Sequence, residues 1–216
     1  MSDDIQTDYE TRVERLLSAF HDIDGLGSQL TIYHLLLKQH QEKGDYLWRI
    51  EPLLFIFLKS LEANLHVSLA RLLEPKNRSH GNIEKFLSFC SANVKRISWN
   101  EGRLTSELIA SQEEELAAHS RAIEAVRARR DKRFAHSDRK YFENADQIME
   151  DFPLTEEDIV SLANCVVRII RVHWSGLNPK KGRLGAHLFN ETAVDNMIRN
   201  LETGRKTNFP GQLERT

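Results

Sequence analysis

The chain has 216 residues, of which 40% are hydrophobic, and its 30 Lys and Arg against 32 Asp and Glu give a formal charge of −2, as in an ordinary soluble globular protein. Its longest uncharged apolar run, Pro52–Leu58, is far shorter than the ~20 residues of a membrane span, and the acidic start MSDDIQTDYE lacks the pattern of a signal peptide. Two cysteines, Cys90 and Cys165, are too few for a disulfide framework, which favours free thiols in a reducing cytoplasm.

Three helices are predicted before residue 75, because apolar residues recur at spacings of three and four and each run ends at glycine or proline. These helices cover residues 5–23, Ser28–Glu42 and about 52–74. The third is apolar on nearly every side at Leu53–Leu58, so we expect it to be the central and most buried helix.

The rest of the chain has the same helical period. Helices are predicted after the capping residue Asn82, over 104–120 and 122–142, after Thr155 and over Asn190–Thr203. Thr155 opens a variant capping box in which Asp158 takes the place of the usual glutamate or glutamine. No run of β-branched residues has the period of two that indicates strands. The sequence therefore predicts an all-α fold, a helical bundle in a single domain of six to eight helices.

Basic residues are concentrated in one window of this mildly acidic chain. From Arg121 to Lys140 there are eight basic residues and three acidic ones, a local charge of +5, so the remainder of the chain sums to −7. Such a concentration indicates a local anionic partner and not a generally adhesive surface.

Two polar residues, Arg130 and Ser137, interrupt the apolar stripe of the predicted helix over 122–142. An arginine on a packed face needs a partner, because an unpaired buried guanidinium is very costly. Arg130 therefore either extends outward or pairs with a core carboxylate, or it faces a cleft or a second subunit, where it is held ready for an anionic ligand. Periodicity leaves both interpretations open.

His136 follows six residues after Arg130 and shares a helix face with Lys132, Arg133 and Lys140. Nearby cations favour the neutral form of a histidine, so His136 is expected to be able to accept a proton. The same cations suit a phosphate ligand. Because Arg130 and His136 point in different directions on an ideal helix, two such helices about a two-fold axis would form a better site than one.

A metal site and a serine nucleophile in this window have weaker support. A cation site is not expected on this basic helix, because its only ligand groups are Asp131, Asp138 and His136, so neither a metal site nor a cofactor is predicted. The two aspartates are instead expected to form ion pairs with neighbouring arginines. Ser137 lacks the flanking glycines of a nucleophile elbow, so it is not predicted to be a hydrolase nucleophile.

The segment RDKRFAH, Arg130–His136, resembles the signature of HEPN proteins, which has an arginine, a polar residue, four further positions and a histidine. Its longer form RDKRFAHSD is similar to the abortive-infection (AbiU-like) branch, in which Asp or Asn follows the arginine and Ala-His-x-Asp ends the motif. The segments VSLARLLEPKNRSHGNIEKFL and DFPLTEEDIVSLANCVVRIIRVHWSGL also resemble that branch. The resemblance extends over roughly residues 45–177.

The resemblance implies that 45–177 is a HEPN core, with the helices of 1–44 packed on the bundle and a basic loop, a terminal helix and a tail in 178–216. It also implies a homodimer formed through the motif helices. The implied activity is metal-independent cleavage of single-stranded RNA by attack of its 2′-hydroxyl, in a toxin or phage-defence role, with a cognate antitoxin as a further partner.

By motif match, Arg130 and His136 would be the catalytic pair. The residues expected to support them are Asp131, Ser137 and Asp138, and those expected to bind RNA are Arg129, Lys132, Arg133 and Lys140. Some HEPN proteins bind RNA, nucleotide or a partner protein without cleaving anything, so a non-catalytic binding module is the alternative.

Overall fold

The computed structural model describes residues 2–21, 25–75, 77, 81–135, 139–144, 146–179, 191–209, 211 and 213. Within these ranges all regular structure is helical and no strand is present. Eight α-helices have ten residues or more, three have five residues, and one further segment is π-helical. The predicted all-α class is confirmed, and the eight longer helices agree with the predicted number.

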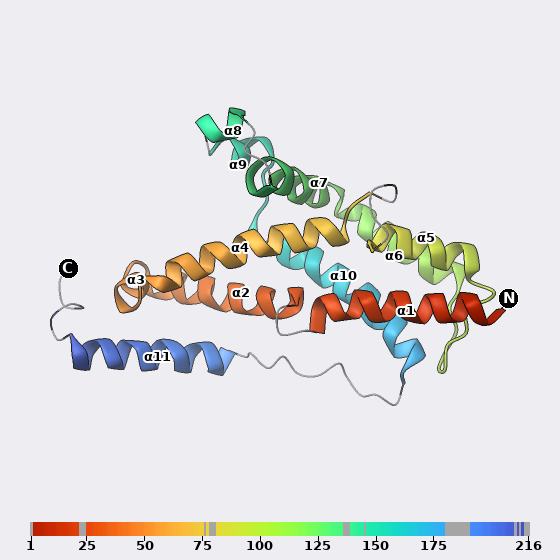
Figure 1. Ribbon diagram of the computed structural model, residues 1–216, viewed down its shortest axis with the longest axis horizontal. Coiled ribbons are helices and arrows are strands. Elements are labelled where there is room, and N and C mark those ends of the chain that lie inside the picture. Colours follow the sequence, from red (N-terminus) through yellow and green to blue (C-terminus); the bar gives the residue numbers. More distant parts are fainter. Residues whose placement is uncertain are drawn as a thin grey trace.

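The body is built on four long helices, α1 (Ser2–His21), α2 (Leu26–Lys43), α4 (Leu53–Leu72) and α10 (Glu156–Leu177). Figure 1 shows α1 and α2 following one another along the long axis, with α4 alongside α2 and α10 packed against α1. Their facing surfaces enclose an apolar core whose most buried members include Leu36, Leu65, Leu69, Leu162 and Val166.

Further helices extend this body at both of its ends. The helices α5 (Ile83–Asn93) and α6 (Ser106–Ala118) pack together at the end that holds the N-terminus (Figure 1). At the other end, α11 (Glu191–Asn208) lies along α2 and the short α3 (Tyr46–Ile50). The start of α1 and the end of α11 therefore lie at opposite ends of the molecule.

The basic window forms a separate arm on one side of the body. It consists of α7 (Ser120–Arg129), the π-helix η1 (Arg130–Ala135), α8 (Arg139–Glu143) and α9 (Gln147–Asp151). Both α7 and η1 pack against α4, whereas α8 and α9 project away from the body (Figure 1). The single helix predicted over 122–142 is therefore wrong in its middle, because the α-helix ends at Arg129.

The predicted starts of two helices are confirmed. The Asn82 side chain accepts a hydrogen bond of 2.7 Å from the N–H of Lys85 at the start of α5. At the start of α10, the Asp158 N–H donates to Thr155 Oγ1 at 3.1 Å and the Thr155 N–H donates to Asp158 Oδ2 at 2.9 Å. Each such cap stabilises its helix by about 1 kcal/mol, because it satisfies N–H groups that have no partner within the helix.

The prediction that the third helix is the most buried one is wrong, because the segment Leu53–Leu58 on which it rested is largely exposed. Leu54 and Leu58 face the core, but Leu53 is 64% exposed and Ile56 is 60% exposed. The N-terminal half of α4 packs on α2 along one face, and its other face is not covered by any described residue. Complete burial needs neighbours on every side, which hydropathy alone does not reveal.

By length and composition, α4 is the one helix among the described residues that could cross a membrane. Core helices also pass this criterion, and 39% of the most apolar window of α4 is buried. Its leucines at positions 54, 58, 61, 65 and 69 all pack into the protein core.

A chain of hydrogen bonds crosses the core. The Trp99 indole N–H donates to Tyr9 Oη at 2.8 Å, and Tyr9 Oη lies 2.8 Å from His173 Nδ1. His173 Nε2 lies 3.0 Å from Gln112 Oε1. Burial lowers the pKa of His173 to about 3, so the imidazole is neutral, with its proton on Nε2 and Tyr9 donating to Nδ1.

Cys90 and Cys165 are buried as free thiols, as predicted. Burial raises the pKa of both thiols. A neutral buried thiol packs as a small apolar side chain and is a poor nucleophile. Both cysteines are therefore core residues.

Candidate functional site

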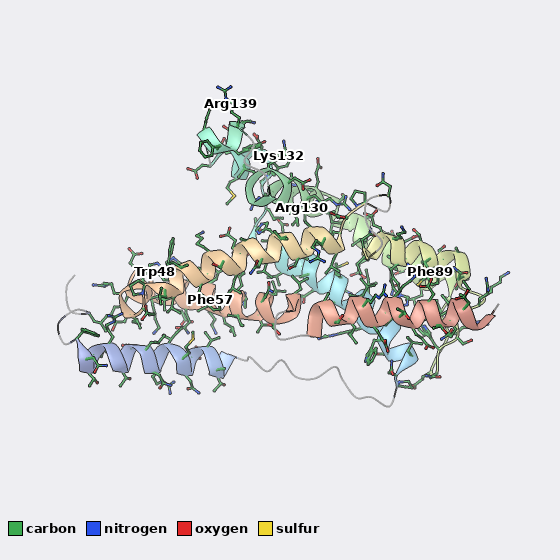
Figure 2. The ribbon with its side chains drawn as sticks, in the orientation of Figure 1. Trp48, Phe57, Phe89, Arg130, Lys132 and Arg139 are labelled. Atoms are coloured by element: carbon green, nitrogen blue, oxygen red, sulfur yellow. The ribbon has the colours of Figure 1, made fainter. Side chains whose placement is uncertain are left out.

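The arginine of the motif stands where the α-helical hydrogen-bond pattern of α7 changes to the π pattern of η1. A π-helical turn has wider i→i+5 hydrogen bonds and is frequently found at functional sites. Figure 2 shows Arg130 between η1 and α4, and Arg139 extending away from the body at the tip of the arm. The motif therefore begins at the junction of the arm with the core.

Arg130 is held by two carboxylates. Its Nη1 donates to Glu74 Oε1 at 2.8 Å, and its Nε forms an ion pair of 2.5 Å with Asp131 Oδ1. Burial by itself lowers the pKa of Arg130, but the hydrogen bond to Glu74 and the charge of Asp131 outweigh it, so the pKa lies above its usual value. The side chain is only 14% exposed. The sequence leaves open whether Arg130 pairs with a core carboxylate or faces a cleft or a second subunit. In the single chain it pairs with carboxylates.

Glu74 is the residue of this site that sequence reasoning missed. It follows the C-terminal end of α4, directly before Pro75, and its side chain is 19% exposed. An arginine on a packed face requires a carboxylate partner, but the spacing of 56 positions between Glu74 and Arg130 carries no periodic signal. Only the packing of η1 on α4 identifies the pair.

Arg127 fixes the same junction from the preceding turn. Its Nε donates to the Leu73 carbonyl at 2.5 Å, and its Nη2 forms an ion pair of 2.8 Å with Glu84 on α5. These contacts tie α7 to the end of α4 and to the start of α5. The position of Arg130 is therefore set by a rigid support.

Arg129 has a structural role. It is only 5% exposed, and its Nε donates to the Phe152 carbonyl at 3.0 Å while Nη2 donates to the Leu154 carbonyl at 3.5 Å. These bonds hold the segment after α9 against α7. The sequence grouped Arg129 with the RNA-binding residues, but a guanidinium buried on backbone carbonyls does not face a ligand, so we remove it from that group.

Lys132 and Lys140 lie on the arm. Lys132 Nζ is 5.2 Å from the centre of the Tyr141 ring and 5.5 Å from that of Phe152. Lys140 forms an ion pair with Asp151, and this hydrogen bond raises the pKa of Lys140. The Tyr141 hydroxyl also donates to Asp151 Oδ2, at 2.8 Å. The ammonium of Lys132 has no carboxylate partner among the described residues, which leaves its charge available to an anion.

Several predicted site residues lie outside the described part of the chain. These are His136, Ser137 and Asp138, and also the side chain of Arg133. The structure therefore brings Arg130 and Asp131 together with Glu74 and places Lys132 and Lys140 on the arm. Among the described residues no group of three or more His, Cys, Asp or Glu side chains is arranged to hold a metal ion.

Comparison with known proteins agrees with the motif. The sequence model of the AbiU2 family of HEPN domains matches residues 7–192, from the first helix to the start of the last. Searches of curated proteins and of solved structures found no match. The family match includes the motif and both of the flanking segments that resemble the abortive-infection branch. The chain belongs to the AbiU2 family of HEPN proteins.

Proposed function

We propose that this protein is a metal-independent endoribonuclease that cleaves single-stranded RNA, acting in the cytoplasm as a toxin or in phage defence. HEPN proteins are often ribonucleases, and the AbiU2 name suggests abortive infection. The observation that supports this proposal most strongly is the fixed position of the motif arginine Arg130, which pairs with Glu74 and Asp131 at a π-helical turn.

The held arginine suits transition-state stabilisation. Nη1 donates a hydrogen bond to Glu74, Nε forms an ion pair with Asp131, and Nη2 makes no hydrogen bond or ion pair to any described residue. That donor is therefore left for a phosphate oxygen. Because the guanidinium is already oriented, it needs no reorganisation when negative charge develops on a phosphorane, which is the condition for strong electrostatic catalysis.

The remaining chemistry is assigned to the substrate and to the motif histidine. RNA contains its own nucleophile, the 2′-hydroxyl. In this proposal neutral His136 removes the 2′-hydroxyl proton, or His136 of the opposite subunit protonates the leaving 5′-oxygen. The new bond joins the 2′-oxygen to phosphorus and the broken bond releases the 5′-oxygen, so the products are a 2′,3′-cyclic phosphate and a 5′-hydroxyl.

A homodimer through the motif helices would place two Arg130–His136 pairs about one groove. Support for an interface comes from apolar side chains on the arm, since Phe142 on α8 is 78% exposed and Met149 on α9 is 37% exposed. Exposed apolar side chains that join in one patch mark contact surfaces, and these two belong to consecutive helices of the arm. Light scattering should give a dimer at micromolar concentration, and Phe142→Asp should shift it towards monomer. A wild-type monomer would contradict the shared site.

The second candidate is a non-catalytic module that binds RNA, nucleotide or a cognate antitoxin through the same arm. The observation that favours it is also the ion pairing of Arg130, because two carboxylates already balance its charge. Growth after induction separates the two candidates. Toxicity that is relieved by His136→Ala favours the enzyme, and harmless expression of the wild type favours the module.

A further inference from the structure

A cavity of about 970 Å³ adjoins the candidate site. It lies between α1, α2 and the C-terminal end of α4, and the start of α5 closes one side. Glu74, the partner of Arg130, is one of its lining residues. The cavity and the candidate site therefore share the residue Glu74.

The charges of the described residues that line the cavity do not balance. Arg12 is paired with Asp8 through two hydrogen bonds of 3.0 and 3.1 Å, and Glu74 is paired with Arg130. Two further arginines line the cavity, Arg15 on α1 and Arg71 on α4. Both are exposed, and neither side chain makes a hydrogen bond or ion pair with a described residue. Among the described residues that line the cavity, two guanidinium groups therefore have no carboxylate partner.

The other walls complete a ligand-sized pocket. Ser18 and Ser68 line the cavity together with the arginines, and Leu16, Leu26 and Phe86 form its apolar part. Its volume lies within the range of about 300–1,000 Å³ that is usual for small-molecule sites. An apolar wall with cationic groups in the same cavity suits a ligand that has both a ring and a phosphate.

We infer that this cavity is a phosphate-binding site in which Arg15 and Arg71 bind the phosphoryl oxygens. The planar guanidinium fork matches phosphate geometry, and both arginines line the same cavity without a partner among the described residues. The phosphate belongs either to a free nucleotide or to an RNA strand that continues from the candidate active site. The second source rests on the proposed function, and the first does not.

The test uses the full-length protein and two probes in titration calorimetry. One probe is inorganic pyrophosphate, and the other is a 2′-O-methyl oligonucleotide of ~10 nucleotides, which stays intact whether or not the protein is a ribonuclease. The variant is Arg15→Gln with Arg71→Gln. The matched control, Arg103→Gln with Arg199→Gln, removes the same charge from two exposed arginines outside the cavity.

The wild type should bind pyrophosphate, and the cavity variant should weaken that binding at least ~10-fold while the control leaves it unchanged. If only the oligonucleotide shows this loss, the phosphate comes from nucleic acid. The inference is overturned if the wild type binds neither probe, or if the cavity variant binds both as the wild type does.

A second variant distinguishes a loss of phosphate binding from a loss of folding. Arg15→Lys with Arg71→Lys keeps both charges and removes the fork geometry, so it should fold normally and weaken binding less than the glutamine variant. Equal affinities for this variant and the wild type would contradict bidentate binding. Cleavage of RNA is assayed separately, so loss of the cavity site and loss of the proposed activity are distinguishable.

Discussion

Glu74 and Arg130 join the end of α4 to the start of η1, with 2.8 Å between Oε1 and Nη1. The pair is largely enclosed, since 19% of the Glu74 side chain and 14% of the Arg130 side chain are exposed. It fixes the first residue of the motif to the most apolar helix of the body. The orientation of the candidate catalytic arginine is therefore set by a residue outside the motif.

Glu74→Gln should lower both stability and activity. The substitution leaves an enclosed guanidinium with a weaker partner, so the free energy of unfolding should fall by about 1–3 kcal/mol. Because Arg130 would lose its orientation, cleavage should fall roughly 10-fold or more in folded protein. Urea denaturation and RNA cleavage measure the two effects.

Glu143→Gln is the matched control for Glu74→Gln. Glu143 also pairs with an arginine of the arm, Arg139, but the two side chains are 63% and 90% exposed. An exposed pair contributes little, so stability should change by less than ~0.5 kcal/mol. Equal effects of the two substitutions would show that the Glu74 pair has no special role.

Arg129→Met tests the structural role of Arg129. The change keeps the aliphatic stem but removes the donors to the Phe152 and Leu154 carbonyls. Urea denaturation should show a loss of about 2–4 kcal/mol, because two carbonyls lose their partner. RNA affinity of the folded protein should not change. A stable Arg129→Met variant with weakened RNA binding would return Arg129 to the RNA-binding residues.

The salt dependence of RNA binding tests the lysines of the arm. If Lys132 and Lys140 each contact one phosphate, replacing both by Gln should reduce the slope of log K against log salt by about 1.4. Lys59→Gln with Lys206→Gln changes the same charge on α4 and α11, where each lysine pairs within its own helix. That control should keep the wild-type slope. An unchanged slope in the Lys132 and Lys140 variant would place the RNA elsewhere.

Stability should depend on pH through His173. Its pKa is about 3 in the folded protein, against an ordinary 6.5, because burial disfavours the charged form. The unfolded chain therefore binds a proton that the folded chain does not, and the free energy of unfolding falls as pH drops below 6.5. Between pH 7 and pH 5 the loss should be about 2 kcal/mol.

The variant His173→Gln isolates this effect. It lacks the titrating group, so the stability difference between wild type and variant should shrink by about 2 kcal/mol from pH 7 to pH 5. Thermal or urea denaturation at the two pH values measures that difference. A difference that stays constant would show that His173 does not titrate between the folded and unfolded states.

Local features of this fold were predictable from the sequence. The Asn82 cap and the Thr155–Asp158 capping box depend on residues three apart, so their patterns are complete within one turn. The helical period identified the helices of the body for the same reason. The motif at Arg130 was also visible, because its spacing lies within a single segment.

Features that depend on distant neighbours were not predictable. Leu53 and Ile56 are exposed because no described element covers that face of α4, and Arg129 is buried because the segment after α9 folds back on α7. Glu74 meets Arg130 only after α4 and η1 pack together. The π-helical turn likewise interrupts a sequence whose period continues as if it were α-helical.

The proposed cleavage is tested most directly with one RNA, in EDTA, beside the same RNA with a single 2′-deoxynucleotide at the cut site. We expect the all-ribose RNA to give a 2′,3′-cyclic phosphate and a 5′-hydroxyl, and the 2′-deoxy RNA to remain intact at that position. Arg130→Ala and His136→Ala should each lower the rate ~10²-fold or more while the protein stays folded. Cleavage that survives the 2′-deoxy substitution, or that stops in EDTA, would contradict the proposed mechanism.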